Sequence, residues 1–570
     1  MKTKTQRGCR ARVINVALAI ALFLASSLIG TAGSVDQGLT VEHNGSNQYT
    51  VSWNAFLSQG LSLQMSTDLA VGGWAPIATA PDSVGGRRQV TVNLSDPQMF
   101  FRLDCTGSGV ADVPDDNFQD TNCDGIDGDI AAAIFVSPLG SDANPGSITQ
   151  PVHSIATAIS KAAAQGKTQV YAAAGTYSAA SFALVNGISI YGGYNATDWT
   201  RTDANVTTLS ATSATAVTAN NLTNPTTLDH LTIVSGASSS PGGSSYGILA
   251  TGSPGLIVHK CTVQAGGGSG GLTGTNGNAG ANGGDGVVGQ KGCESSSGPF
   301  CKTCAQPQGG PGGSSVCGRA GGPGGSSGVG GNGGTMGGTS ANGTAGGSGG
   351  GGGGHGDGVM GSPGATGVAG TDGPAAVPGS FAVGGYVATS GAAGTDGTPG
   401  NGGGGGGGGG GGTSGCDSYG SSGGGGGGGG CLGTAATGGQ SGGGSFAIYL
   451  FASDVHIETC TLLTGNGGAG GSAGTGGAPG IHGLGGPGGP YGGSAEQDDG
   501  GNGAPGGIGG DGGRGGHGGG GAGGSSIGVL KAGGSTPQLT STTFTIGSAG
   551  PGGASAGQAG PSGTAATIFP

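Results

Sequence analysis

Glycine at every third position is the feature that most restricts how this chain can fold. A strict triplet matches an extended helix with three residues per turn, in which one edge of each segment carries no side chain. Glycine supplies 150 of the 570 residues, and because it adds no side chain to a core, the core-forming residues must lie elsewhere. The blocks with triplet spacing are residues 268–292, 322–337, 358–373, 465–492 and 500–524.

Two interpretations of these blocks stand once collagen is set aside. Proline is too sparse for a collagen triple helix, since residues 465–492 contain only Pro479, Pro487 and Pro490. One interpretation is a bundle of polyglycine-II-like helices packed beside a solenoid, and the other is a set of flexible low-complexity loops. The uninterrupted glycine runs at 402–412 and 423–430 favour flexible loops locally.

A six-residue pattern recurs outside the glycine blocks. It has Ser or Thr second, an apolar residue third and Gly last, so alternation along a strand points the first and third side chains inward. Similar strands at irregular spacing predict a solenoid with long insertions leaving from one corner, here at about 265–442 and 465–524. The copies are ISIYGG (188–193), LTIVSG (231–236), CTVQAG (261–266), CTLLTG (460–465) and TTFTIG (542–547).

The segment before these strands resembles the first turn of a right-handed parallel β-helix of the pectate-lyase-like type. The resemblance rests on a strand at 134–136, Gly140-Ser141-Asp142, Pro151, an amphipathic helix near Ile155–Ala164, and strands at 170–177 and 188–194. In that family the helix caps the first coil and shields its open edge. The resemblance implies an all-β fold in which a right-handed parallel β-helix with long Gly-rich insertions occupies residues 134–570.

The first 33 residues have the parts of a secretory signal peptide: a basic segment at 1–12, an apolar run at 13–29 and small residues at 30–33. An uncleaved anchor is the alternative, because the run nearly reaches the roughly 18 residues that span a bilayer. We therefore expect a secreted or cell-surface protein with no membrane span after signal removal.

Export also predicts disulfides. The chain has 11 cysteines, and removal of Cys9 with the signal peptide leaves an even number in an oxidising compartment. Four of the cysteines lie close together in the sequence: Cys293, Cys301, Cys304 and Cys317. Four cysteines could bind zinc, but in an exported chain we expect them to form two local disulfides. Cys416 and Cys431 would form a further pair. Cys261 and Cys460 share the first position of the six-residue pattern. We expect them to stack in the interior, either as buried thiols or as a disulfide bridge.

Residues 39–104 have ordinary composition and alternating hydrophobic residues, which predict a small antiparallel β-sandwich. The phrase SLQMSTDL…W…FFRL makes this segment resemble the fibronectin-type-III-like accessory domains of secreted bacterial proteins. The expected strands lie near Leu39–Glu42, Tyr49–Trp53, Leu61–Met65, Trp74–Ala78, Gln89–Leu94 and Met99–Leu103.

Residues 105–133 form an acidic linker with a candidate calcium loop. Acidic or amide side chains alternate in DTNCDGIDGD (120–129), a spacing that lets oxygens converge on a hard cation. The loop resembles the opening of an EF-hand, dockerin or thrombospondin-type calcium loop, but Ala131 stands where an EF-hand has its bidentate Glu. The predicted ligands are Asp120, Asn122, Asp124, Asp127 and Asp129. The alternative is a solvated linker pinned by a Cys105–Cys123 disulfide.

The chain offers scattered polar groups rather than a recognisable catalytic site. Polysaccharide lyases and hydrolases with a β-helix fold need acids and cations clustered on one face. The candidates are Asp198, Arg201, Asp203, Asp229, His230, His259, Lys260, Asp454, His456 and Glu458. Aligning the six-residue copies pairs His259 with Glu458 and yields no stacked carboxylate pair. We therefore interpret these groups as solvated surface and predict no catalytic residue.

The net charge of −12 with few cations argues against nucleic-acid binding. In its repeats the chain resembles PE-PGRS-type surface proteins, without their PE domain, and outer-surface β-helix proteins of unknown function. The resemblance implies a structural or adhesive role, with no enzymatic activity and with carbohydrate, extracellular matrix or a cell-surface polymer as partner. The alternatives are a polysaccharide-acting lyase or glycoside hydrolase and, ranked lower, an ice- or surface-binding protein, motivated by Thr232, Thr262, Thr461 and Thr543.

Overall fold

The computed structural model describes residues 14–17, 39–45, 47–54, 61–67, 73–84, 87–94, 98–105, 111–122, 124–294, 305–329, 332–352, 356–412, 418–491 and 500–570. These residues are nearly all β with long parallel sheets, and their one α-helix is α1 (Ile155–Gln165). The all-β class is therefore confirmed. Of the predicted signal peptide only β1 (Ile14–Ala17) is described, so the signal peptide stays a prediction.

Residues 39–105 form two antiparallel sheets, and β1 pairs with the edge of one of them. One has the order β1, β8 (Gln98–Cys105), β4 (Leu61–Ser66) and β5 (Ala75–Pro76); the other has β2 (Thr40–Gly45), β3 (Gln48–Asn54), β7 (Arg87–Asn93) and β6 (Asp82–Val84). Their apolar faces share a core in which Val51, Trp53 and Phe101 are fully buried. The sequence did not predict β6, because all three of its residues are exposed and show no apolar alternation.

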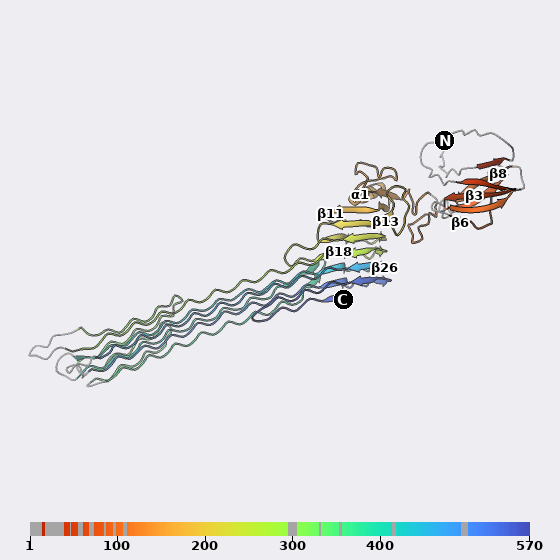
Figure 1. The fold of residues 1–570 in the computed structure, drawn as a ribbon. Helices are drawn as coiled ribbons and strands as arrows, with labels where there is room; N and C mark the ends of the chain where they lie inside the picture. The colour runs from red at the N-terminus through yellow and green to blue at the C-terminus, as the bar shows by residue number, and fades with distance from the viewer. Residues whose placement is uncertain are drawn as a thin grey trace, which may run out of the picture.

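Three parallel sheets follow, and together they are called the stack (Figure 1). The first sheet has the order β29 (Gln538–Thr540), β26 (His456–Glu458), β19 (Leu256–His259), β16 (Thr226–Asp229), β13 (Ser189–Tyr194), β10 (Gln169–Ala173) and β9 (Ala133–Val136). The second has β11 (Gly175–Ala179), β14 (Thr207–Ala211), β17 (Leu231–Val234), β20 (Thr262–Gln264), β27 (Thr461–Leu463) and β30 (Thr543–Thr545). The third has β12 (Phe182–Ala183), β15 (Thr215–Asn220), β18 (Ser245–Thr251), β25 (Ser445–Phe451), β28 (Ser526–Ala532) and β31 (Ala565–Phe569).

The register of these sheets aligns equivalent residues into columns. In the second sheet Leu209, Ile233, Val263, Leu462 and Phe544 are successive partners, and the first four are fully buried. Four of the six-residue copies lie in this sheet. The copy at 188–193 is an exception, because it falls on β13 of the first sheet. A pattern of apolar residues inward and a hydroxyl outward fits any strand of a coil, so it does not identify which sheet the strand joins.

The helix α1 lies where the sequence predicts it, over one end of the stack. Ser154 caps its N-terminus by accepting a hydrogen bond from Thr157 N, and Gly166 ends it in the left-handed region with φ 64°. Its buried face, Ile155, Ala158, Ile159 and Ala162, joins the apolar interior. The helix therefore covers the strands of the first coil, and it contacts β9, β10 and β12.

The glycine-rich segments connect the second sheet to the third at the same corner in successive coils. They run between β20 and β25, between β27 and β28, and between β30 and β31. Figure 1 shows these segments side by side, projecting from the stack as a long rod, here called the bundle. The hairpin of β22 (Ser380–Ala382) and β23 (Gly385–Val387) returns from the bundle to the third sheet, where Tyr386 N donates to Tyr246 Oη at 2.8 Å.

Hydrogen bonds in the bundle follow the glycine triplet. The successive N–H groups of Gly424, Gly425 and Gly426 donate to three different segments, at Ala504 O (2.9 Å), Val287 O (2.9 Å) and Gly322 O (2.8 Å). The N–H groups of the next three residues, 427–429, donate to the same three segments in the same order, at Gly507 O, Gly284 O and Arg319 O. A segment with neighbours on all three sides has room for no side chain, whereas a peripheral segment needs glycine only on its inner edge.

The pure glycine runs are therefore the centre of the bundle. Residues 402–412 and 423–430 are buried along their whole length and are bonded to neighbours on every side. The interpretation of these runs as flexible loops is wrong. Uninterrupted glycine indicates here that no face of the segment is free, rather than that the segment lacks structure.

The disulfides also differ from the expected local pairs. Cys317 is bonded to Cys431, which lies 114 residues away, so the predicted pairing of Cys416 with Cys431 is wrong. Cys293 is disulfide-bonded as well, while Cys301, Cys304, Cys416 and Cys123 lie outside the described residues. Cys261 and Cys460 are buried free thiols, the first of the two alternatives given for them.

Candidate functional site

The acidic segment 111–130 is docked against the outer face of the first sheet. Ile126 is buried in an aromatic cluster with Phe135, Tyr171 and Tyr194. Tyr194 Oη donates to Asp127 O at 2.6 Å, and the buried carboxylate of Asp112 accepts hydrogen bonds from Thr121 and from Gly128 N. The alternative of a solvated linker is therefore wrong for this segment, since its carboxylates take part in a packed contact.

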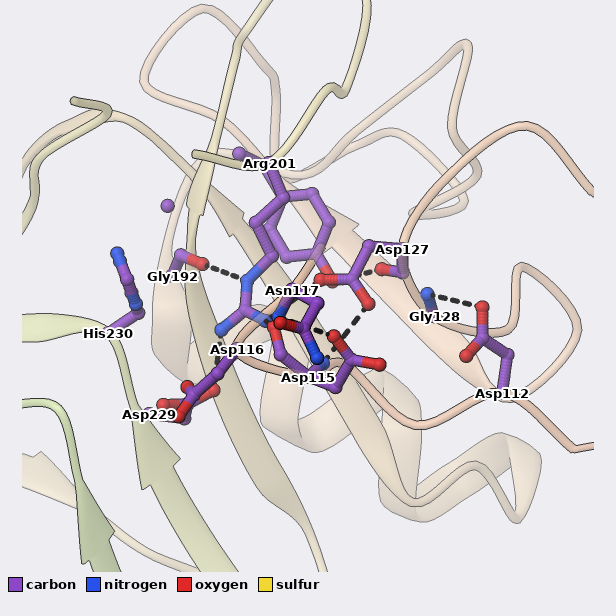
Figure 2. A network of polar contacts seen from close by, with 12 residues as sticks. Asp112, Asp115, Asp116, Asn117, Asp127, Gly128, Gly192, Arg201, Asp229 and His230 are labelled. Carbon is purple, nitrogen blue, oxygen red and sulfur yellow. Dashed lines mark hydrogen bonds and ion pairs between the residues drawn. The ribbon is translucent and has the colours of Figure 1, made fainter. Parts of the chain in front are cut away.

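Arg201 joins this segment to the sheet, as Figure 2 shows. Its side chain is 1% exposed and forms ion pairs with Asp127 Oδ2 at 3.0 Å and with Asp229 Oδ2 at 2.5 Å. It also donates through Nε to Gly192 O at 2.9 Å and through a terminal nitrogen to Asp115 O at 3.2 Å. One guanidinium thus holds one carboxylate of the docked segment and one carboxylate of β16.

Aromatic rings complete the surroundings of this guanidinium. Its carbon atom lies 5.5 Å from the ring centre of Tyr194, 5.6 Å from that of Phe118 and 5.9 Å from that of Tyr191. Ring faces attract cations and exclude water, so they favour the charged form of Arg201 in a buried position. One buried cation thus faces two buried carboxylates, those of Asp127 and Asp229.

A second layer of charged residues lies closer to solvent. His259 Nδ1 contacts Asp229 Oδ1 at 2.8 Å, and His259 Nε2 faces Asp116 Oδ2 at 3.6 Å. Lys260 Nζ lies 3.2 Å from Asp116 and 3.5 Å from Asp203. The His259 side chain is 22% exposed, whereas the Asp229 side chain beneath it is 5% exposed. A partly exposed imidazole oriented by a buried carboxylate is the geometry of a general base, and here it also contacts the docked segment.

Register explains why these residues meet. Asp229 on β16 is the partner of His259 on β19, and His259 is in turn the partner of Glu458 on β26. His230 and Lys260 follow at the corner of the stack, in the left-handed region with φ 59° and 46°. His230 Nε2 lies 3.2 Å from Asp203, which adds one more contact to the layer. Sheet pairing therefore produces a column of Asp229, His259 and Glu458, each of which stands two residues before a six-residue copy. The sequence alignment paired only His259 with Glu458, and extending it by one copy would have placed Asp229 in the same column.

The environment changes the pKa values of these groups in different directions. Burial raises the pKa of Asp127 to about 7, although Arg201 opposes the shift. Burial would also raise the pKa of Asp229, but the hydrogen bond from His259 and the charge of Arg201 lower it overall. The hydrogen bond to Asp229 raises the pKa of His259 despite burial. Burial lowers the pKa of His230, with the charge of Arg201 acting in the same direction.

The predicted calcium ligands do not act as one group in this structure. Asp120 and Asn122 both accept a hydrogen bond from Asp124 N, at 3.1 Å and 2.9 Å, so their oxygens point to the same place. Asp127 instead faces Arg201, and Asp129 Oδ1 accepts from Ala131 N at 2.8 Å. Among the described residues no group of three His, Cys, Asp or Glu side chains is arranged to hold a metal ion. The residues do not fit a closed calcium site as they stand, and calcium binding stays a prediction.

The other sequence-selected candidates divide into two groups. Those that meet around Arg201 are Asp203, Asp229, His230, His259 and Lys260. Asp198 and Asp454 instead accept hydrogen bonds from backbone N–H groups, Asp198 from Thr200 two residues away and Asp454 from Thr536, which is 82 residues away. His456 is exposed and lies two positions before Glu458 on β26, where its partners are Ile257 and Gln538 rather than members of the column of Asp229 and His259. Sequence reasoning missed Asp116 and Asp127 as members of the cluster, because only docking of the linker brings them to the sheet.

Comparison with known proteins adds no assignment. No protein-family model, curated protein or solved structure matches this chain. Within the described part of the chain, no helix has the length and apolar character needed to cross a bilayer.

Proposed function

We propose that the stack is a right-handed parallel β-helix and that the bundle is built from polyglycine-II-like helices. The chain passes through the third, first and second sheets in a fixed order, and each strand pairs in parallel with its counterpart one coil later. In the bundle, the hydrogen-bond partner changes with each residue and recurs at every third, as expected for three residues per turn. The resemblance of residues 134–194 to pectate-lyase-like proteins supports the same proposal.

On this architecture we propose a secreted or cell-surface structural protein with an adhesive role. The single observation that carries the proposal is the bundle itself, whose central segments are bonded on all sides and therefore resist bending. A stiff rod that stands out from the stack presents side chains at a distance from the rest of the molecule. Its outer segments expose uncharged side chains, including Ile481 at 60% and Leu484 at 59%. Many such weak contacts suit carbohydrate, extracellular matrix or a cell-surface polymer.

The adhesive role is tested by binding to a glycan array and to immobilised matrix polymers. Ile481 and Leu484 lie on one outer segment next to residues 283–286. Their carbonyl oxygens accept hydrogen bonds from Gly283 N and Gly286 N. The double variant Ile481→Lys/Leu484→Lys should weaken binding at least about tenfold, since each exposed apolar contact is worth roughly 1 kcal/mol and is replaced by a hydrated charge.

The matched control is Val84→Lys/Leu139→Lys, which changes two side chains of 53% and 84% exposure outside the bundle. This variant should bind like the wild type. Equal loss in both double variants would point to a general effect of added charge and would contradict adhesion through the bundle. Unsaturated or reducing-end sugar products in the same assay would contradict a purely structural role.

A polysaccharide-acting enzyme is the second candidate, and the contact between Asp229 and His259 favours it. A buried carboxylate that orients a partly exposed imidazole is suited to removing a proton from a sugar carbon or hydroxyl. Incubation with uronate-containing polymers, with and without calcium, tests this candidate. Release of products by the wild type and a loss of at least about a hundredfold in His259→Gln would support it; no release by the wild type would remove it.

Ice or crystal-surface binding is the third candidate. The threonines Thr232, Thr262, Thr461 and Thr543 are successive partners in the second sheet and form one column on its outer face. Thermal hysteresis of the purified protein would support this candidate, and freezing at the equilibrium temperature would exclude it.

A further inference from the structure

The two ends of the stack differ in what covers their apolar interior. At the first coil α1 lies over β9, β10 and β12. At the last coil β29, β30 and β31 are the final strands of the three sheets, and no described strand pairs with their outer edges. These three strands are called the terminal face. Unpaired backbone groups along a strand edge are a template for pairing with another chain.

The interior of the stack reaches this face without being closed. In the third sheet Val217, Ile248, Ile448 and Val529 are successive partners and each is 0% exposed, but the next partner, Ile568, is 42% exposed. The other two sheets end in the same way. Leu539 follows buried Ile457 in the first sheet, Phe544 follows buried Leu462 in the second, and both are only partly buried. Each column of core residues therefore stops at a half-covered apolar side chain.

The terminal face also lacks charge, which is one of the features by which proteins prevent edge pairing. Edge strands usually carry Lys or other charges, which would have to be desolvated if two edges met. Residues 532–570 contain no Asp, Glu, Lys, Arg or His, in a chain whose net charge is −12. Two copies of this protein repel each other over most of their surface at neutral pH, but not where two terminal faces meet.

We propose that the terminal face binds a second copy of this chain, with the two stacks joined end to end about a two-fold axis. Three observations select this occupant: the open edges, the exposed core residues and the absence of charge. A two-fold axis lets the same surface serve on both sides, so that each edge meets an edge and each apolar side chain meets the opposite core. The dimer would carry two bundles, which goes beyond the proposed function and would raise the avidity of any adhesive contact.

The mass of the full-length protein in solution tests this proposal. Light scattering after gel filtration and sedimentation velocity across the micromolar range should give twice the monomer mass for the wild type. Gln538→Lys/Thr545→Lys places one charge on each of two exposed positions of the terminal face and should shift the dissociation constant upward at least about a hundredfold, because like charges then meet across the axis.

Gln264→Lys is the matched control, since Gln264 is equally exposed but lies on β20 in the middle of the stack. It should dimerise like the wild type, and circular dichroism should show the same fold for all three proteins. A monomeric wild type would overturn the proposal and would mean that another partner or a further segment covers this end. A dimer that survives the Gln538→Lys/Thr545→Lys change would place the contact elsewhere and would also overturn it.

Discussion

The centre of the bundle should reject even one methyl group. Gly406 lies in the central run 402–412, and a Cβ atom added there would lie 2.1 Å from Ala504 O and 2.5 Å from Pro505 O. Both atoms belong to the backbone, so no change of rotamer relieves the contact. Ordinary contact begins at 3.4 Å, so one segment must move by about 1.3 Å, which is 3.4 minus 2.1.

The cost of that movement follows from the hydrogen bonds. If residue 406 moves, its bonds to Gly424 O (2.9 Å) and from Gly325 N (2.8 Å) are stretched beyond bonding distance. If Ala504 moves instead, it loses its bonds to Gly407 O and from Gly424 N, both 2.9 Å. Two buried backbone bonds left unmade cost about 2–6 kcal/mol. Alanine restricts the unfolded chain and returns about 0.4–1 kcal/mol, so Gly406→Ala should destabilise the bundle locally by roughly 1–6 kcal/mol.

Amide hydrogen exchange measured on peptides that cover residues 402–412 and 500–510 tests this estimate. Because about 1.4 kcal/mol corresponds to a tenfold change, exchange in Gly406→Ala should be faster by roughly fivefold or more. Gly351→Ala is the control, since Gly351 is an exposed bundle residue whose added Cβ meets nothing within 4 Å. Exchange in Gly406→Ala within about threefold of Gly351→Ala would show that the central segments are not close-packed.

Three further predictions concern the docked segment and the disulfide. Arg201→Gln leaves Asp127 and Asp229 buried without their cation and should destabilise the docked segment 111–130 by about 3–5 kcal/mol, measured by limited proteolysis of that segment. The control is Arg514→Gln, which breaks the more exposed pair with Asp372 and should change the stability of the docked segment by less than about 1 kcal/mol. The melting temperature should fall as pH rises from about 5.5 to 8, because His259 and Asp127 both have raised pKa values in the folded protein. Their protonated forms therefore stabilise the folded state at low pH, and this stabilisation is lost as pH rises through those pKa values. His259→Gln should flatten that slope, and an unchanged slope would exclude His259 as a source of it. Cys317→Ser opens a loop closed across 114 residues and should cost up to about 4–5 kcal/mol, seen as a lower thermal midpoint that reduction of the wild type reproduces.

Short-range patterns were informative about local structure. Alternation of apolar and polar residues located β2, β3, β4, β7 and β8, and the amphipathic spacing at 155–164 located α1, because each pattern depends on neighbours a few residues away. The triplet spacing predicted segments with three residues per turn for the same reason. The error at 402–412 came from treating uninterrupted glycine as absence of structure, when it is also what a segment enclosed by neighbours requires.

The charge cluster was not predictable in the same way. Arg201, Asp229 and His259 were each among the candidate residues. Asp229 and His259 both stand two residues before a six-residue copy, which indicates that they align, but nothing in the spacing of Arg201 or Asp127 indicates contact. Asp229 meets His259 because β16 pairs with β19 in one register, and Asp127 meets Arg201 because residues 111–130 fold back over the sheet. Both facts depend on contacts between distant parts of the chain.

The sequence by itself thus determined where many of the strands lie, that the class is all-β, and where glycine leaves no side chain. Tertiary structure alone decided which glycine segments are central, which cysteines pair, which carboxylates are buried and which end of the stack is left open. The physical reason is that strand and helix periodicities are properties of a few consecutive residues, whereas burial and pairing depend on which distant segments come to lie beside them.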